Sequence, residues 1–249
     1  MVDAFNTTTD LRGRGFRLVD PPVNILNYDP AGDGDDHDAL VLVSREEWRR
    51  GELHDPDLSM EFIFRILLAQ RMPKDWEFPD KVAGILRLNK QLLRWQSKGL
   101  QHAHVIGVES NGVGYAMASS LRHRTGVPVM AYTTVGKASD TPFESKKVAM
   151  PRLASLDNLR VLFELHRLKM VPDIQGKDDL VSELNSFVWA RAGRPEAMTG
   201  QHDDLVMALA GACWIGTKLL PPVTKQVKID PRHGIQSHVQ RGSANIRLN

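Results

Sequence analysis

The chain has 249 residues, of which 42% are hydrophobic and 25% are charged, and its formal net charge is +2. This balance is typical of a globular protein with a substantial core, and it excludes a wholly disordered chain. The single cysteine, Cys213, excludes an intramolecular disulfide scaffold; it lies in an apolar run, so we expect it to be buried and reduced.

No segment predicts a membrane span. The longest apolar stretch, 205–215, has about half the length that a bilayer requires. The first 20 residues mix acids, threonines and arginines and contain no apolar core of a secretory signal. The tail, 222–249, carries five lysines and arginines against one acid, which suggests an anionic partner or a docking arm.

Apolar runs and helical periodicity predict alternating strands and helices. The predicted strands are 23–28, 39–43, 60–69, 104–108 and 127–132, with a short strand or turn at 170–171. The predicted helices are 79–98, 111–124, 146–168, 178–189 and 203–219, with a loop over 193–201.

Three strands followed by alternating helices and strands predict an α/β fold with one mixed central sheet, flanked by helices on both faces. The Gly/Asp-rich loop between the first two strands indicates an antiparallel hairpin. We divide the chain into a lead-in (1–22), one domain (23–220) and the basic tail (221–249).

Acidic residues occur where this fold would gather them. Asp29 ends the first strand, Glu109 ends the fourth, and Asp203 and Asp204 begin the last helix. In α/β sheets such positions converge at one edge, where ligands bind. Carboxylates gathered there repel one another unless a cation holds them, and Mg²⁺ or Mn²⁺ prefers oxygen ligands. Two such ions about 4 Å apart can activate a water and stabilise the leaving oxygen of a phosphodiester.

Each acid has an ordinary structural explanation when taken alone. Asp29 precedes Pro30 and fits a turn. Asp203 fits a helix N-cap, and Glu109 fits a solvated strand end. The ordered combination of all of them favours the metal site.

Three segments carry a family resemblance: YDPAGDGDD (28–36), VIGVESNGVG (105–114) and HDDLVMALAGA (202–212). They resemble the nuclease domain of the large terminase subunit of tailed phages, and the resemblance extends over 23–214. It implies a ribonuclease H-like fold and an endonuclease that cuts concatemeric double-stranded viral DNA during genome packaging. It also implies a packaging ATPase domain or subunit, a portal protein and a small terminase subunit as partners, in the cytoplasm of the infected bacterium.

The resemblance implies two-metal catalysis by Asp29, Glu109 and an aspartate of the last helix. On a helical wheel Asp204 flanks the core stripe, so we expect it to be the ligand and Asp203 to be a second ligand or a cap. His202 is a candidate donor to the scissile phosphate, a partner of a ligand, or a surface histidine.

One position departs from the pattern of the family. Many relatives have a further acid where this chain has Met207. Asp33, Asp35 or Asp36, in the loop after the first strand, is a candidate replacement.

Phosphate binding needs cations near the acidic edge. We expect Lys137, Lys146, Lys147 and Arg152 to contact DNA, because they follow the fifth strand in a loop and helix start. Few aromatic residues are present, so single-strand stacking and strong sequence specificity are not indicated. The chain contains no GxxxxGK[ST] motif, so we do not expect it to hydrolyse ATP by itself.

Three alternatives remain open. The first is a Holliday-junction resolvase or transposase-like nuclease with the same fold. The second is a non-catalytic module that docks on DNA or the portal through its basic tail. The third is a domain whose acids are only caps and turns.

Overall fold

The computed structural model describes residues 11–18, 22–31, 36–51, 59–97, 103–136, 148–189, 195–197 and 202–220. The basic tail lies outside these ranges. Within them, no helix is long and apolar enough to cross a membrane.

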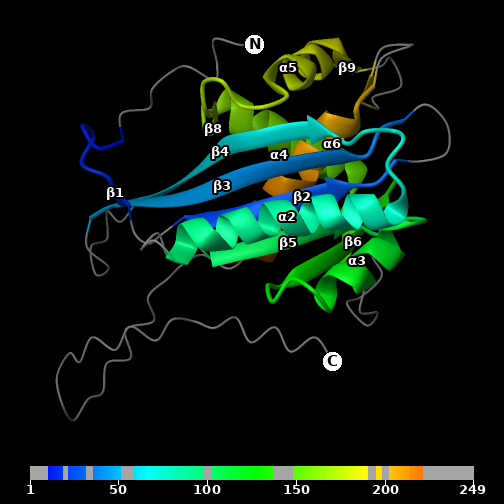
Figure 1. Cartoon of the computed structure of the whole chain (residues 1–249). Coiled ribbons are helices and arrows are strands. Elements are labelled where there is room, and N and C mark those ends of the chain that lie inside the picture. Colours follow the sequence, from blue (N-terminus) through cyan, green and yellow to red (C-terminus); the bar gives the residue numbers. More distant parts are fainter. Residues whose placement is uncertain are drawn as a thin grey trace.

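An eight-stranded mixed sheet forms the centre of the protein (Figure 1). Its strands are β1 (Arg17–Leu18), β2 (Val23–Asp29), β3 (Ala39–Arg50), β4 (Ser59–Arg71), β5 (Ala103–Glu109), β6 (Val129–Val135), β7 (Val148–Pro151) and β8 (Leu168–Met170). The spatial order is β7-β6-β5-β2-β3-β4-β8, and β1 pairs with β3. The β2–β3–β4 meander is antiparallel, as predicted for β2 and β3, whereas β5 joins β2 in parallel.

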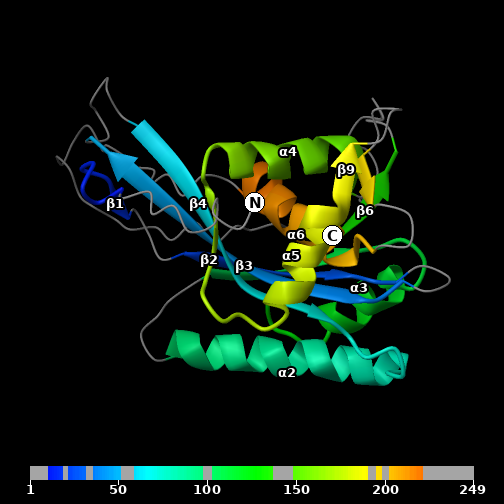
Figure 2. The same ribbon diagram turned by 90° about the horizontal axis from the view of Figure 1, so that it is seen from above.

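Helices cover both faces of this sheet (Figure 2). They are α2 (Phe78–Ser97), α3 (Gly114–Arg122), α4 (Arg152–Glu164), α5 (Lys177–Ser186) and α6 (Asp204–Trp214), with a π-helical turn, η1 (Ile215–Leu219), after α6. Side chains of α2 and α3 form the core on one face, and those of α4, α5 and α6 form the core on the other. The predicted fold class is therefore confirmed.

The hydrophobic pattern explains this layering. In β3, Leu40 and Leu42 enter the core beneath α2, while Val41 and Val43 enter the core beneath α6. Alternate residues of a strand point to opposite faces, so a continuous apolar run is buried on both. Helix α6 is buried from Leu205 to Cys213, as expected for a helix that is apolar all round.

The helix predicted over 146–168 is wrong at both ends. Residues 148–151 form β7, because the residue before Pro151 favours an extended backbone. The helix ends at Glu164, and His166 then adopts a φ of 54°, which a right-handed helix does not allow.

Smaller differences concern other helix ends. The helix predicted over 178–189 stops at Ser186, because the β-prone sequence Phe187–Trp189 forms β9. Strand β9 pairs with β10 (Pro195–Ala197), inside the predicted loop over 193–201.

Part of the predicted lead-in packs on the sheet. Leu11 and Phe16 form a small core with Trp48 of β3 and Ile63 of β4. Strand β1 pairs with the part of β3 that lies beyond the first residue of β2. The division at residue 22 stays a prediction.

Candidate active site

Two carboxylates of the site end neighbouring parallel strands. Tyr28 of β2 pairs with Val108 of β5. Asp29 and Glu109 are the next residues of these two strands, so both lie at the same edge of the sheet. Both are in phase with core residues beneath α6, since side chains alternate along a strand. The two carboxylates therefore face the same side of the sheet.

The other predicted acids contribute to the charge around Asp29. Burial raises the pKa of Asp29 well above its usual value, and the charges of Glu109, Asp204 and Asp203 raise it further. Arg152 lowers it. A group whose ionisation is opposed in this way by several carboxylates is typical of a site that binds cations.

Glu109 is held rigidly by backbone donors. Its Oε2 accepts a hydrogen bond from Asn111 N at 2.9 Å, and its Oε1 accepts one from Thr134 N at 3.0 Å. The start of α3 also packs closely against the backbone of this residue, because a Cβ added to Gly114 would lie 1.8 Å from the Glu109 carbonyl oxygen. The small residue at 114 is thus required for α3 to begin so close to the site.

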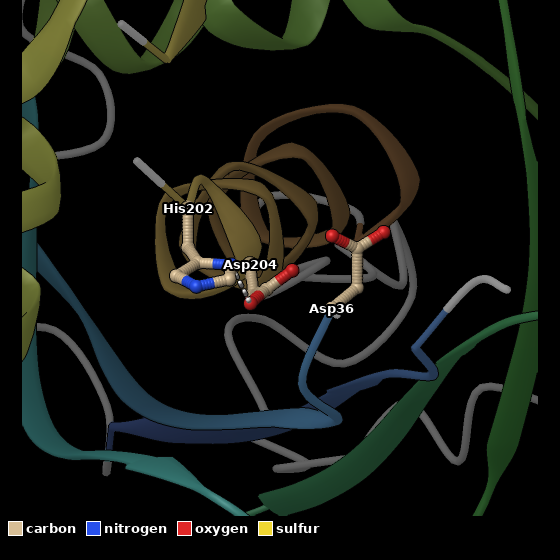
Figure 3. A group of neighbouring side chains, drawn as sticks. All are labelled: Asp36, His202 and Asp204. Atoms are coloured by element: carbon tan, nitrogen blue, oxygen red, sulfur yellow. Dashed lines mark ion pairs between the residues drawn. The ribbon is translucent and has the colours of Figure 1, made fainter. Parts of the chain in front are cut away.

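Asp204 lies in a second group with Asp36 and His202 (Figure 3). One potential ligand atom from each of the three lies within 4.8 Å of the others. Asp204 Oδ2 accepts a hydrogen bond from His37 N at 3.1 Å and is 3.8 Å from His202 Nδ1. Of the candidate replacements for the acid missing at Met207, Asp36 therefore lies beside Asp204, while Asp33 and Asp35 fall outside the described residues.

The electrostatics of Asp204 resemble those of Asp29. Burial raises its pKa, the hydrogen bond from His37 counteracts that rise, and the charge of Asp36 adds to it. His202 is partly buried, and its ring packs edge-to-face on His37 with centroids 5.4 Å apart. The three interpretations of His202 all stay predictions, since 33% of its side chain is exposed.

Asp203 occupies the N-cap position of α6 but its side chain caps nothing. It forms an ion pair with Arg152, the first residue of α4. Of the two roles predicted for Asp203, a second ligand or a cap, the cap is not formed, because another carboxylate, that of Glu183, accepts the free N–H groups at the start of α6. The ligand role stays a prediction.

Glu183 on α5 was not predicted. Its Oε2 accepts hydrogen bonds from Leu205 N (2.8 Å) and Val206 N (3.1 Å), and its Oε1 pairs with Arg71 at 2.6 Å. Burial raises the pKa of Glu183, although these donors oppose the rise. The signal was an acid three residues after Leu180, on the apolar face of its helix.

The predicted DNA contacts lie mostly beyond the described ranges. Lys137, Lys146 and Lys147 fall outside them. Arg152 lies at the acidic edge, where it pairs with Asp203. Its contact with DNA stays a prediction.

The donor set of the site fits divalent cations. Asp29, Glu109, Asp36, Asp203 and Asp204 offer carboxylate oxygens, and His202 adds an imidazole. Such a set suits Mg²⁺ or Mn²⁺, and the imidazole suits the transition metal in particular.

The mixed sheet with helices on both faces defines a ribonuclease H-like α/β fold. More particularly, the chain has the fold of terminase nuclease domains, which confirms the resemblance stated above at the level of the fold. One structure of the human cytomegalovirus terminase nuclease domain, Mn-soaked and inhibitor-bound, is 15% identical, with a TM-score of 0.50; the match covers 80% of this chain and 86% of that one.

Two further solved structures show lower scores. Another structure of the cytomegalovirus domain is 13% identical over 86% of this chain and 88% of that chain, with a TM-score of 0.48. The nuclease domain of the Thermus phage P74-26 large terminase is 18% identical over 81% and 85%, with a TM-score of 0.44. No family model matches the sequence, and no curated protein matches it at a significant level.

Proposed function

We propose that this chain is a metal-dependent endonuclease that cleaves double-stranded viral DNA during genome packaging. The observation that carries the proposal is that Asp29 and Glu109 end neighbouring parallel strands, where the charge of Asp204, from a distant segment, also acts on Asp29. The fold shared with the cytomegalovirus domain, whose structure was soaked with manganese, supports it.

In this proposal Asp29, Glu109 and Asp204 hold two Mg²⁺ or Mn²⁺ ions, and Asp36 and Asp203 supply further oxygens. Bound ions of this kind activate a water and stabilise the leaving oxygen of a phosphodiester. The two backbone N–H groups on Glu109 keep its carboxylate fixed in orientation. His202, beside Asp204, donates a hydrogen bond to the scissile phosphate.

The substrate and the partners follow from the same proposal. Duplex DNA runs past the acidic edge, with Arg152 and the lysines at 137, 146 and 147 on its phosphates. The chain works with a packaging ATPase, a portal protein and a small terminase subunit in the cytoplasm of the host. These partners position the DNA, and positioning supplies much of the rate in phosphoryl chemistry.

A plasmid-cleavage assay tests the proposal. Supercoiled DNA is incubated with the chain in Mn²⁺, Mg²⁺ or EDTA, alongside Asp29→Asn and Asp204→Asn. The matched control is Asp157→Asn, a half-exposed aspartate of α4 that pairs with Arg160. We expect metal-dependent nicking that both site variants lose and the control keeps. Full cleavage by Asp29→Asn in excess chelator would sink the metal mechanism.

Two further substrates separate the alternatives. A resolvase would cut a four-way junction in preference to a linear duplex, whereas we expect no such preference. A docking module would bind duplex DNA but would neither cut it nor bind Mn²⁺.

A further inference from the structure

A buried polar cluster lies beneath the acidic site, two residues back along β2. Asn27 is fully buried, and its Nδ2 donates to Tyr132 Oη at 2.9 Å and to the Ala208 carbonyl oxygen at 2.8 Å. These two bonds join β2, β6 and α6 in the middle of an otherwise apolar core. We call Asn27, Tyr132 and the Ala208 carbonyl the asparagine clasp.

Each element in the clasp carries or supports a carboxylate of the site. Asn27 precedes Asp29 by two residues on the same face of β2. Ala208 lies four residues, one helical turn, after Asp204. Tyr132 is the register partner of Glu109, and Thr134, two residues further on, donates its N–H to that carboxylate.

Two glycines allow the clasp to close. A Cβ added to Gly211 of α6 would lie 2.3 Å from Tyr132 Oη and 2.6 Å from Asn27 Nδ2. A Cβ added to Gly107 of β5 would lie 2.3 Å from Asn27 Oδ1. Because both positions lack a side chain, the backbones of α6 and β5 can lie directly against Asn27 on its two sides.

We propose that Asn27 and Tyr132 are positioning residues: the asparagine clasp sets how far α6 stands from β2 and β5, and hence the spacing of Asp204 from Asp29 and Glu109. This inference rests on the proposed function, because that spacing matters only if the three carboxylates share metal ions. Groups that orient metal ligands commonly change metal affinity by about 10–100-fold when they are removed.

The test is direct Mn²⁺ binding, measured from the EPR signal of the free ion, at a temperature well below unfolding. Tyr132→Phe removes one hydroxyl and keeps the ring in the core. The control is Asn89→Ala, which removes another buried side-chain bond, from Asn89 Nδ2 to the Thr125 carbonyl oxygen, on the α2 face of the sheet. We expect Tyr132→Phe to weaken Mn²⁺ binding about tenfold, and Asn89→Ala to leave it unchanged although its Tm falls.

Gly211→Ala perturbs the clasp from the helix side and gives a second measurement. It should weaken Mn²⁺ binding at least as much as Tyr132→Phe does. Wild-type Mn²⁺ affinity in both clasp variants would overturn the inference, as would losses that merely follow Tm across all three variants. If the unaltered chain binds no Mn²⁺, the proposed function itself fails. If it binds Mn²⁺ and both clasp variants bind it with the same affinity, the positioning role alone fails.

Discussion

Replacing Asp29 by asparagine should stabilise the metal-free protein while it destroys the site. In the folded chain, burial and the charges of Glu109, Asp204 and Asp203 all oppose ionisation of Asp29. Asparagine has nearly the same shape and no charge, so it removes this repulsion at neutral pH. A residue kept only for stability would behave in the opposite way.

The spacing of the strands gives the magnitude. Neighbouring strands lie about 4.8 Å apart, so about 5 Å is the scale of separation for two charges at the adjacent ends of β2 and β5. At an effective dielectric constant of about 20–80, one such repulsion costs about 1–3 kcal/mol. For a domain of this size each kcal/mol shifts Tm by about 2–4 °C.

Thermal unfolding in EDTA and in saturating Mn²⁺ measures both effects. In EDTA, Asp29→Asn should unfold several degrees above the unaltered chain. In Mn²⁺ the unaltered chain should gain about 2.7 kcal/mol when free metal reaches 100 times its Kd, and the variant should gain much less. Asp157→Asn should match the unaltered chain in both buffers, because an exposed helix pair contributes little. A variant that is less stable in EDTA, or that keeps the full Mn²⁺ gain, would refute the reasoning.

Three more outcomes follow. Glu183→Ala should cost about 3 kcal/mol in denaturant unfolding, because it leaves the buried Leu205 and Val206 N–H groups and the partly buried guanidinium of Arg71 without their acceptor; a cost near zero would contradict the capping role. Gly114→Ala should lower both Tm and Mn²⁺ affinity, since its Cβ would collide with the Glu109 carbonyl oxygen; unchanged values would mean that α3 shifts freely. Burial raises the pKa of Asp29 and that of Asp204 in the folded chain. The metal-free chain should therefore lose stability as the pH rises above the ordinary carboxyl pKa of about 4, and Mn²⁺ should reverse that loss. A Tm that rises with pH in EDTA would show the opposite linkage.

The sequence predicted most of the sheet because its signals are local. The runs at 23–28, 39–43 and 104–108 are each too apolar for a solvent-exposed loop, and each forms a strand. Element ends were predicted less well, because they depend on single residues. Pro151 and the positive φ of His166 cut the helix predicted over 146–168, and neither effect shows in hydrophobic periodicity.

For the candidate site, the sequence predicted the places of those acids whose order along the chain follows from the fold. Asp29 and Glu109 end neighbouring strands, a relation that an α/β pattern implies. The role of Asp203 could not be read from its position before a helix, because a partner in space, Glu183, already accepts the N–H groups of α6. Asp36 could be named only as one of three candidates, since nothing local distinguishes it from Asp33 and Asp35.

The supports of the site share one property: each reaches its carboxylate from a different segment. Glu109 is fixed by Thr134 N of β6, and Asp204 is fixed by His37 N from the loop before β3. Carboxylates that repel one another can remain together without a cation only if such contacts oppose their separation. Long-range packing therefore offsets the electrostatic repulsion within the acidic cluster. This explains why a buried asparagine and two glycines lie where an apolar core would otherwise be more stable. Substitutions in these supports should change metal affinity first and the cleavage step only through it.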